Sequence, residues 1–189
     1  MPENAPERAI VPELDHANRL HLDEAEGWLG LGDWVEANIA LDKITPELRA
    51  HPDVLRVRCM IYCDAAQWQS CAEVAGALLA MLPEDAMGWI NRAYALRRAP
   101  GGSVQAAYDA LLPAADRVHD REMVLFNLAC YSCQLGRLKE AREWLTRCLA
   151  EASRHGMLKQ RRLQAQEEPD LKALWQTSEP GALGEASAD

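Results

Sequence analysis

The sequence of 189 residues has no apolar run that approaches the roughly 20 residues needed to cross a bilayer. Its first residues, Met1 to Arg8, lack the basic start and apolar core of a secretory signal. Basic residues are in the minority, with 20 Lys and Arg against 29 Asp and Glu, and the net charge is −9. Binding to a phosphate backbone requires clustered positive charge. These absences predict a cytoplasmic protein without membrane or nucleic-acid partners.

The sequence also lacks the residue patterns of a catalytic or metal site. Its six cysteines are irregularly spaced, which does not fit a disulfide framework, so we expect reduced thiols. The five histidines are scattered, and no Ser-His-Asp or paired-carboxylate arrangement is evident. Cys130 and Cys133 form a Cys-x2-Cys motif, but it lies deep in a predicted helix and lacks the further ligands of a zinc site. Small packing residues are the favoured interpretation over redox or metal chemistry, and we expect no enzyme, cofactor or metal.

What the sequence does contain is a repeat with a period near 34 residues. The copies start near Asn18, Pro52, Ala86 and Glu122, at spacings of 34, 34 and 36 residues. A fixed period of this length indicates stacked pairs of helices. The best alignment between copies falls on three six-residue segments, 32–37, 66–71 and 136–141.

Proline, glycine and capping residues divide the repeats into helices. Gly32 and Gly136 separate the helices of their pairs, and Pro113 is expected to kink or end the sixth helix. Leu171, Leu174 and Trp175 give the last segment an apolar side that is expected to cover the end of the array. The predicted helices are about 14–31, 34–44, 52–64, 68–82, 85–98, 104–117, 121–135 and 138–152, followed by helical segments after 157 and after 168.

The repeat resembles the tetratricopeptide family, whose pattern combines Trp-x2-Leu-Gly-x2-Tyr with Ala-x3-Phe and Pro. The fourth copy carries Leu128-Ala129 and then Ala141-x3-Leu145, and the resemblance covers about 135 residues. No copy keeps the glycine of the first helix, but every copy has a small residue there. The small contact residues are Ala25, Cys59, Ala93 and Ala129 in the first helices and Ala37, Cys71, Ala107 and Ala141 in the second.

The resemblance implies an all-α solenoid of about four antiparallel helical hairpins in a right-handed superhelix, with a C-terminal capping helix. We expect a flexible N-terminus (1–12), four repeats within 13–153 (about 18–51, 52–85, 86–121 and 122–153), capping helices (154–177) and a disordered tail (178–189). The resemblance also implies a concave groove, lined by the first helix of each pair, that holds a peptide or a partner's helix. The groove residues so assigned are Arg56, Met60, Met87, Ile90, Asn91, Tyr94, Arg97, Arg98, Met123, Phe126, Asn127 and Cys130.

Three features of this groove leave alternatives open. Asn91 and Asn127 hold equivalent places and could bond a ligand's backbone, or bond between helices instead. The methionines and aromatics form either an adaptable apolar surface or a core covered by the chain's own C-terminal helix. Arg56, Arg97 and Arg98 could hold a ligand carboxylate, or simply belong to a solvated helix face.

The leading hypothesis is a noncatalytic protein–protein interaction module: an adaptor, a scaffold or a chaperone-like protein. The alternative is a structural or self-assembling unit whose groove is filled by its own termini or by a second copy. The partner is another protein or peptide, and homo-oligomers are left open.

Overall fold

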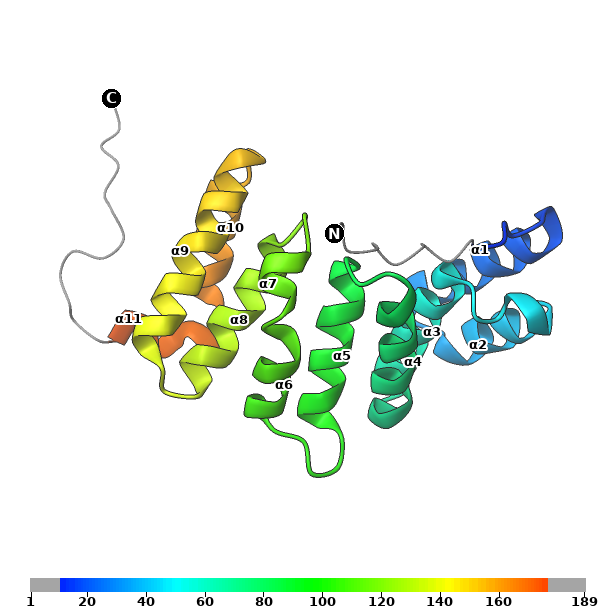
Figure 1. Cartoon of the computed structure of the whole chain (residues 1–189), viewed down its shortest axis with the longest axis horizontal. Coiled ribbons are helices and arrows are strands. Elements are labelled where there is room, and N and C mark those ends of the chain that lie inside the picture. Colours follow the sequence, from blue (N-terminus) through cyan, green and yellow to red (C-terminus); the bar gives the residue numbers. More distant parts are fainter. Residues whose placement is uncertain (1–10, 177–189) are drawn as a thin grey trace, which may run out of the picture. The chain divides into compact units, whose positions relative to one another are not determined.

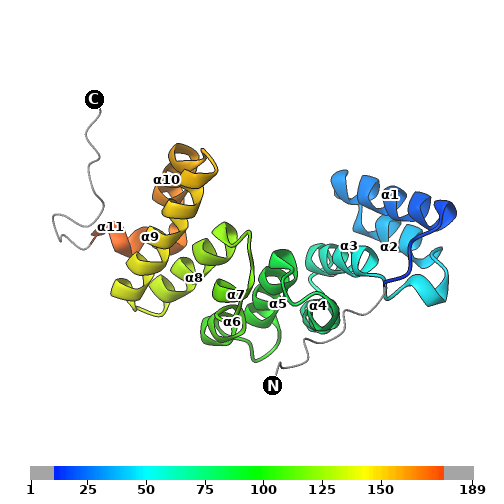
Figure 2. The same cartoon turned by 45° about the horizontal axis from the view of Figure 1, so that its top comes forward.

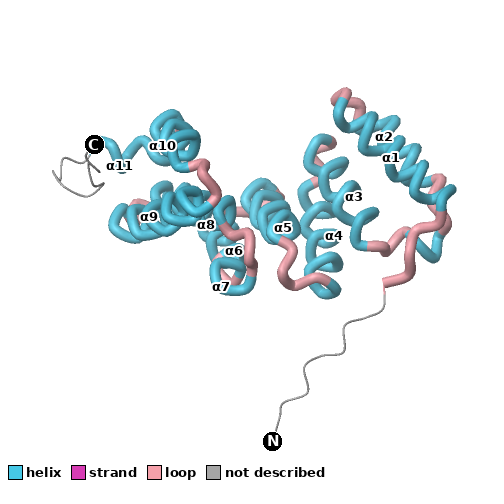
Figure 3. Tube along the Cα trace, turned by 90° about the horizontal axis from the view of Figure 1, so that it is seen from above, coloured by secondary structure: helices cyan, strands magenta, loops and turns pink. Residues whose placement is uncertain are grey.

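A computed structural model describes residues 11–176 of the chain. These residues form helices and loops and contain no strand, as Figure 3 shows. The helices pack against their neighbours in an all-helical arrangement, which confirms the predicted fold class at that level. The predicted tail at 178–189, and all but the last two residues of the predicted N-terminal segment, lie outside the described residues.

The chain divides into two compact units, residues 1–110 and residues 111–189. We call them unit 1 and unit 2. The division falls one residue before the end of α6, inside the third predicted repeat, although the sequence suggested one continuous array. The helices that begin in unit 1 are α1 (His16–Gly30), α2 (Trp34–Asp42), η1 (Pro46–Leu48), α3 (Pro52–Asp64), α4 (Trp68–Met81), α5 (Ala86–Arg98) and α6 (Val104–Leu111).

Local capping residues set the starts of these helices. Asp15, Asp33 and Asp85 each accept a hydrogen bond from the backbone N–H three residues later. The hydroxyl of Ser103 does the same for α6, at 3.0 Å. Pro52 occupies the first turn of α3, where its missing N–H leaves no bond unmade. The helix starts predicted from these residues are therefore confirmed to within about two residues.

Three turns that the sequence aligned have the same backbone hydrogen bonds. The backbone N–H of Gly32, Ala66 or Gly136 donates to the carbonyl three residues earlier in the chain. The N–H of the residue that follows each of them donates to the carbonyl five residues before that following residue. All three residues have positive φ, at 78°, 53° and 75°. Glycine adopts this conformation without strain, whereas Ala66 does so at a cost. Three of the four predicted repeats thus share one turn geometry.

The core of unit 1 is built where α1 packs against α2 and α3 against α4 (Figure 1). The predicted small contact residues Ala25, Ala37, Cys59 and Cys71 are fully buried. The sulfur of Cys71 lies 3.6 Å from the carbonyl oxygen of Cys59, so the predicted contact between these two residues is confirmed. Larger apolar residues complete the first cluster: Leu22, Leu41, Ile44, Val54, Val57 and Ile61.

Unit 2 consists of a helix pair and a C-terminal segment. Its helices are α7 (Ala114–Arg117), α8 (Glu122–Gln134), α9 (Leu138–Arg154), α10 (Leu158–Glu167), η2 (Pro169–Leu171) and α11 (Lys172–Gln176). α8 packs along α9, and α10 and α11 contact α9 (Figure 2). The short helix η2 lies on α8. Pro113 precedes α7 directly, so the sixth predicted helix is interrupted there and divided into α6 and α7.

The C-terminal segment, residues 158–176, buries fewer of its predicted apolar residues than expected. Leu171 and Leu174 are buried, as predicted. Trp175 is 39% exposed, so the prediction that it is largely buried was wrong. Its indole N–H donates to the carbonyl of Ala165 at 3.3 Å, and this bond holds the ring along α10 with one side open to solvent.

Candidate interaction surface

One side of unit 1 is formed by α1, α3 and α5, the first helices of the predicted pairs. Helical spacing places Asp53, Arg56 and Met60 on one side of α3, and Met87, Ile90 and Tyr94 on one side of α5. α3 contacts both α1 and α5. We call this surface, defined by Arg19 together with those six residues, the α1–α3–α5 face.

Ion pairs run across the face from helix to helix. Arg19 on α1 lies 3.5 Å from Asp53 on α3, and Asp53 lies 2.6 Å from Arg56. Arg56 also donates from Nε to Asp85 at 2.7 Å. Asp85 is the N-cap of α5, so one carboxylate both starts α5 and ties it to α3. Arg56 therefore has two carboxylate partners inside the protein, which favours a structural role over the predicted capture of a ligand carboxylate.

Apolar side chains remain exposed between these ion pairs. Met60 and Met87 are 50% and 52% exposed, and Ile90 and Tyr94 are partly exposed. Methionine side chains are flexible and polarizable, so they can adapt to differently shaped apolar groups. These four side chains are therefore accessible to a partner.

An aromatic cluster lies toward the C-terminal end of α5. The rings of Tyr94 and Trp68 meet edge to face, with their centroids 5.7 Å apart. The guanidinium carbon of Arg98 lies 3.5 Å from the Tyr94 centroid. Arg97, the neighbouring predicted residue, is partly exposed. The stacking holds the charge of Arg98 beside the apolar part of the face.

Thiols lie behind this surface. The sulfurs of Cys63 and Cys71 are 3.4 Å apart, and the Cys71 sulfur is 3.9 Å from the carbonyl oxygen of Asn91. Hydrogen bonding to Cys59 raises the pKa of Cys71 to about 12, and hydrogen bonding to Cys71 raises the pKa of Cys63. The raised pKa values keep both thiols protonated at neutral pH, which disfavours a role as nucleophiles. The side chain of Asn91 is partly exposed.

The matching side of α8 in unit 2 is covered by the chain itself. Phe126 and Cys130 were predicted to line the groove, yet both are buried. The guanidinium of Arg161 on α10 lies 5.2 Å from the Phe126 ring centroid, and η2 packs on α8. Burial raises the pKa of Cys130, and the charges of Glu168 and Asp170 raise it further. Contact with a partner is blocked at these two positions, so we leave Phe126 and Cys130 out of the proposed binding surface.

The other two predicted residues of α8 are accessible. Met123 is exposed, and Asn127 is partly exposed. The amide nitrogen of Asn127 donates to the carbonyl of Met123 at 2.8 Å, within the same helix. Asn127 therefore already satisfies one of its two amide hydrogens in its own helix.

A buried ion pair holds the C-terminal segment on α8. Arg161 donates from Nε to Glu122 at 2.6 Å, and both side chains are buried. Burial also raises the pKa of Cys133, although hydrogen bonds from the backbone of Leu174 and Ala173 act in the opposite direction. The sequence left this cover open as an alternative, but it did not reveal the ion pair, because the two partners are 39 residues apart and follow no repeat spacing.

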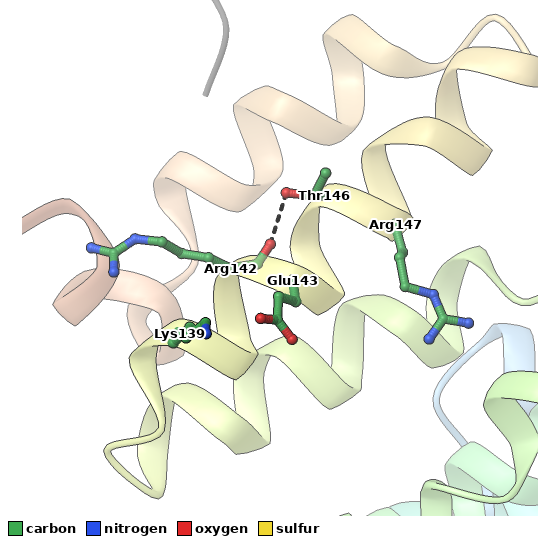
Figure 4. Close-up of a pocket in the computed structure, with 5 residues that line it drawn as sticks. All are labelled: Lys139, Arg142, Glu143, Thr146 and Arg147. Carbon is green, nitrogen blue, oxygen red and sulfur yellow. Dashed lines mark hydrogen bonds between the residues drawn. The ribbon is translucent and has the colours of Figure 1, made fainter. Parts of the chain in front are cut away.

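A basic surface on α9 was also missed. Lys139, Arg142, Glu143, Thr146 and Arg147 line a shallow depression along successive turns of this helix. Figure 4 shows Arg142 and Arg147 extending in opposite directions, with Thr146 donating to the carbonyl of Arg142 at 2.8 Å. Residues 137–163 contain eight Lys and Arg against three Asp and Glu. The net negative charge of the whole chain gives no sign of this basic cluster, whereas a charge count over short segments would have identified it.

Within the described residues, no group of three or more His, Cys, Asp or Glu side chains could hold a metal ion. None of the helices within residues 11–176 combines the length and apolar character that a membrane crossing requires. Comparison with known proteins found no matching family model and no similar curated protein.

Proposed function

We propose that the protein is a noncatalytic interaction module whose α1–α3–α5 face holds a peptide or a short helical segment of another protein. The observation that carries this proposal is the exposure of Met60 and Met87, each about half exposed on a face that ion pairs cross from helix to helix. Exposed methionines on an ordered surface are typical of sites that bind apolar side chains of varied shape.

The chain's own C-terminal segment indicates what kind of partner suits such a face. On α8, the positions equivalent to Met60 and Ile90 are Cys130 and Phe126, and both are covered. Their cover includes a short helical stretch in which the acidic residues at 168 and 170 precede the buried Leu171 and Leu174. We therefore propose a partner segment with apolar residues three positions apart.

The repeat architecture behind this proposal is that of tetratricopeptide-like hairpins. The shared turn geometry at Gly32, Ala66 and Gly136 and the buried small residues support it. In this interpretation each first helix contributes one strip of the binding face, and stacked pairs form the right-handed superhelix that the resemblance implies. The proposed setting of the interaction is the cytoplasm.

The structural alternative has one observation in its favour. In unit 2 the C-terminal segment occupies the α8 face through buried leucines and the Arg161–Glu122 ion pair. If covering this face were the segment's only role and unit 1 bound nothing, the chain would be a self-contained structural unit. The exposed methionines of unit 1 favour the interaction module instead.

The test is a selection from random peptides of about 12 residues displayed on phage. We expect recovered peptides to carry apolar residues three positions apart, and to bind the Met60→Glu and Met87→Glu double variant at least about tenfold more weakly, because a carboxylate cannot be buried against apolar groups. Met157→Glu is the matched control, since Met157 is exposed in unit 2. Equal affinity for the double variant and the native chain would refute the assignment of the face, and failure to recover any peptide would refute the function.

A further inference from the structure

Unit 1 carries an apolar surface that lies outside the α1–α3–α5 face. Leu31, which follows α1, is 77% exposed, and Val35 and Ile39 are exposed on α2. Val35 and Ile39 lie one turn apart, opposite the buried Ala37 and Leu41. Residues 1–110 contain nine Lys and Arg against seventeen Asp and Glu, so this apolar surface lies on a strongly acidic unit. We call Leu31, Val35 and Ile39 the α2 surface.

Unit 2 carries an apolar surface of the opposite charge. Leu158, Lys159, Arg162, Leu163 and Gln166 line a depression on the outer side of α10. Leu163 is exposed, while Arg161 and Ala165 on the other side of the helix are buried. The basic side chains of α9 shown in Figure 4 add to the same positively charged stretch, residues 137–163. We call the five residues of this depression the α10 surface.

The two surfaces are complementary in both respects. Each presents aliphatic side chains that would lose contact with water on association. The surrounding charges are opposite, because unit 1 has an acidic excess and Lys43, one turn after Ile39, is paired with Glu24, while Lys159 and Arg162 flank Leu163. Opposite charge around an apolar centre steers association and suppresses wrong pairings.

We propose that the α10 surface of one copy of the chain binds the α2 surface of a second copy. The binding partner is a second copy because one chain carries both complementary surfaces, an acidic apolar surface and a basic apolar surface. The two surfaces differ, so the contact is head to tail and each copy keeps one surface available for a further copy. Few residues take part, so the association is weak and depends on concentration and salt.

The experiment is sedimentation equilibrium of the full chain at concentrations up to about 0.5 mM, in the range where small interfaces associate. The weight-average mass of the native chain should rise continuously above the 21.0 kDa of one copy, and should fall back when salt is raised from about 0.05 to 0.5 M. A native chain that stays at 21.0 kDa throughout would overturn the proposal.

Two variants sharpen the test. Ile39→Asp removes the α2 surface and Leu163→Asp removes the α10 surface, and both positions are exposed. Each variant alone should remain a single copy, because every contact needs both surfaces. An equimolar mixture should form dimers of twice 21.0 kDa and nothing larger, because only one productive contact remains. Association of either variant alone, or no association in the mixture, contradicts the proposal.

The control is Leu20→Asp, which changes an exposed leucine on α1 outside both surfaces and should associate like the native chain. Circular dichroism establishes that each variant is folded, and Val35→Asp replaces Ile39→Asp if that variant unfolds. Binding of a labelled oligonucleotide to Lys159 and Arg162 without any self-association would show that the basic surface serves nucleic acid, and would overturn the proposal.

Discussion

The ion pair between Arg161 and Glu122 is the contact in unit 2 whose removal has the clearest expected consequence. Arg161 donates to Glu122 at 2.6 Å, and both side chains are buried between α10 and α8. In Arg161→Met the carboxylate of Glu122 stays buried without its partner. Breaking a buried pair in this way costs about 3–5 kcal/mol. Domains typically have about 5–15 kcal/mol of stability in total, so a substantial part of it would be lost.

The double variant Glu122→Leu with Arg161→Met should behave differently. Replacing both charges by apolar side chains leaves no uncompensated carboxylate, and such replacements are often neutral or stabilising. We expect its stability to lie within about 1 kcal/mol of the native chain, or above it. The adjacent variant Arg162→Met is the control, because Arg162 is exposed and its loss should change stability by less than about 0.5 kcal/mol.

The assay is urea denaturation followed by circular dichroism and tryptophan fluorescence, with the midpoint and slope fitted for each variant. The reasoning is refuted if Arg161→Met is as stable as Arg162→Met, or if the double variant is as unstable as Arg161→Met. If Arg161→Met is as stable as Arg162→Met, the ion pair is exposed to water. If the double variant is as unstable as Arg161→Met, the shape of Arg161 contributes more to stability than its charge does.

Three further predictions concern the backbone, the charges and the apolar contacts. Ala66→Gly should stabilise unit 1 by about 0.5–1 kcal/mol because Ala66 has positive φ, whereas Ala65→Gly should destabilise it; thermal melts compare the two. A hydrogen bond from Arg121 lowers the pKa of Glu151. The stability that ionised Glu151 contributes is therefore present above the usual carboxyl pKa and is lost as the pH falls through the lowered pKa. Glu151→Gln should flatten this part of the acid-unfolding curve. Leu171→Ala should cost about 2–5 kcal/mol in urea unfolding, and more than Trp175→Ala, because Leu171 is fully buried; equal losses would show that the cover does not depend on Leu171.

Local chemistry explains why much of the fold was predictable from the sequence. Helix starts follow from capping residues such as Asp33, and the break at Pro113 follows from its missing N–H. The close approach of the helices follows from small residues such as Cys59 and Cys71. Each of these residues acts within one helix or between two neighbouring helices. The repeat places similar residues at equivalent positions, so the same pattern can be recognised in several copies.

Contacts between distant residues explain what the sequence did not reveal. Arg56 meets Asp85 and Arg161 meets Glu122 across 29 and 39 residues, and neither pairing follows from helical spacing. The burial of Phe126 depends on the path of a C-terminal segment outside the repeat. The exposure of Met60 and Met87 in unit 1 therefore agrees with the positions that the repeat assigns, whereas the burial of Phe126 and Cys130 in unit 2 does not.

The central claim is that the α1–α3–α5 face receives a partner segment, and methyl NMR of methionine tests it most directly. The chain has six methionines, and those within the described residues are Met60, Met81, Met87, Met123 and Met157. Chain labelled with 13C at these methyl groups is titrated with a peptide from the phage selection. The account predicts that the signals of Met60 and Met87 shift in saturable fashion while those of Met123 and Met157 stay unchanged. Shifts confined to Met123 or Met157, with Met60 and Met87 unaffected, would contradict it.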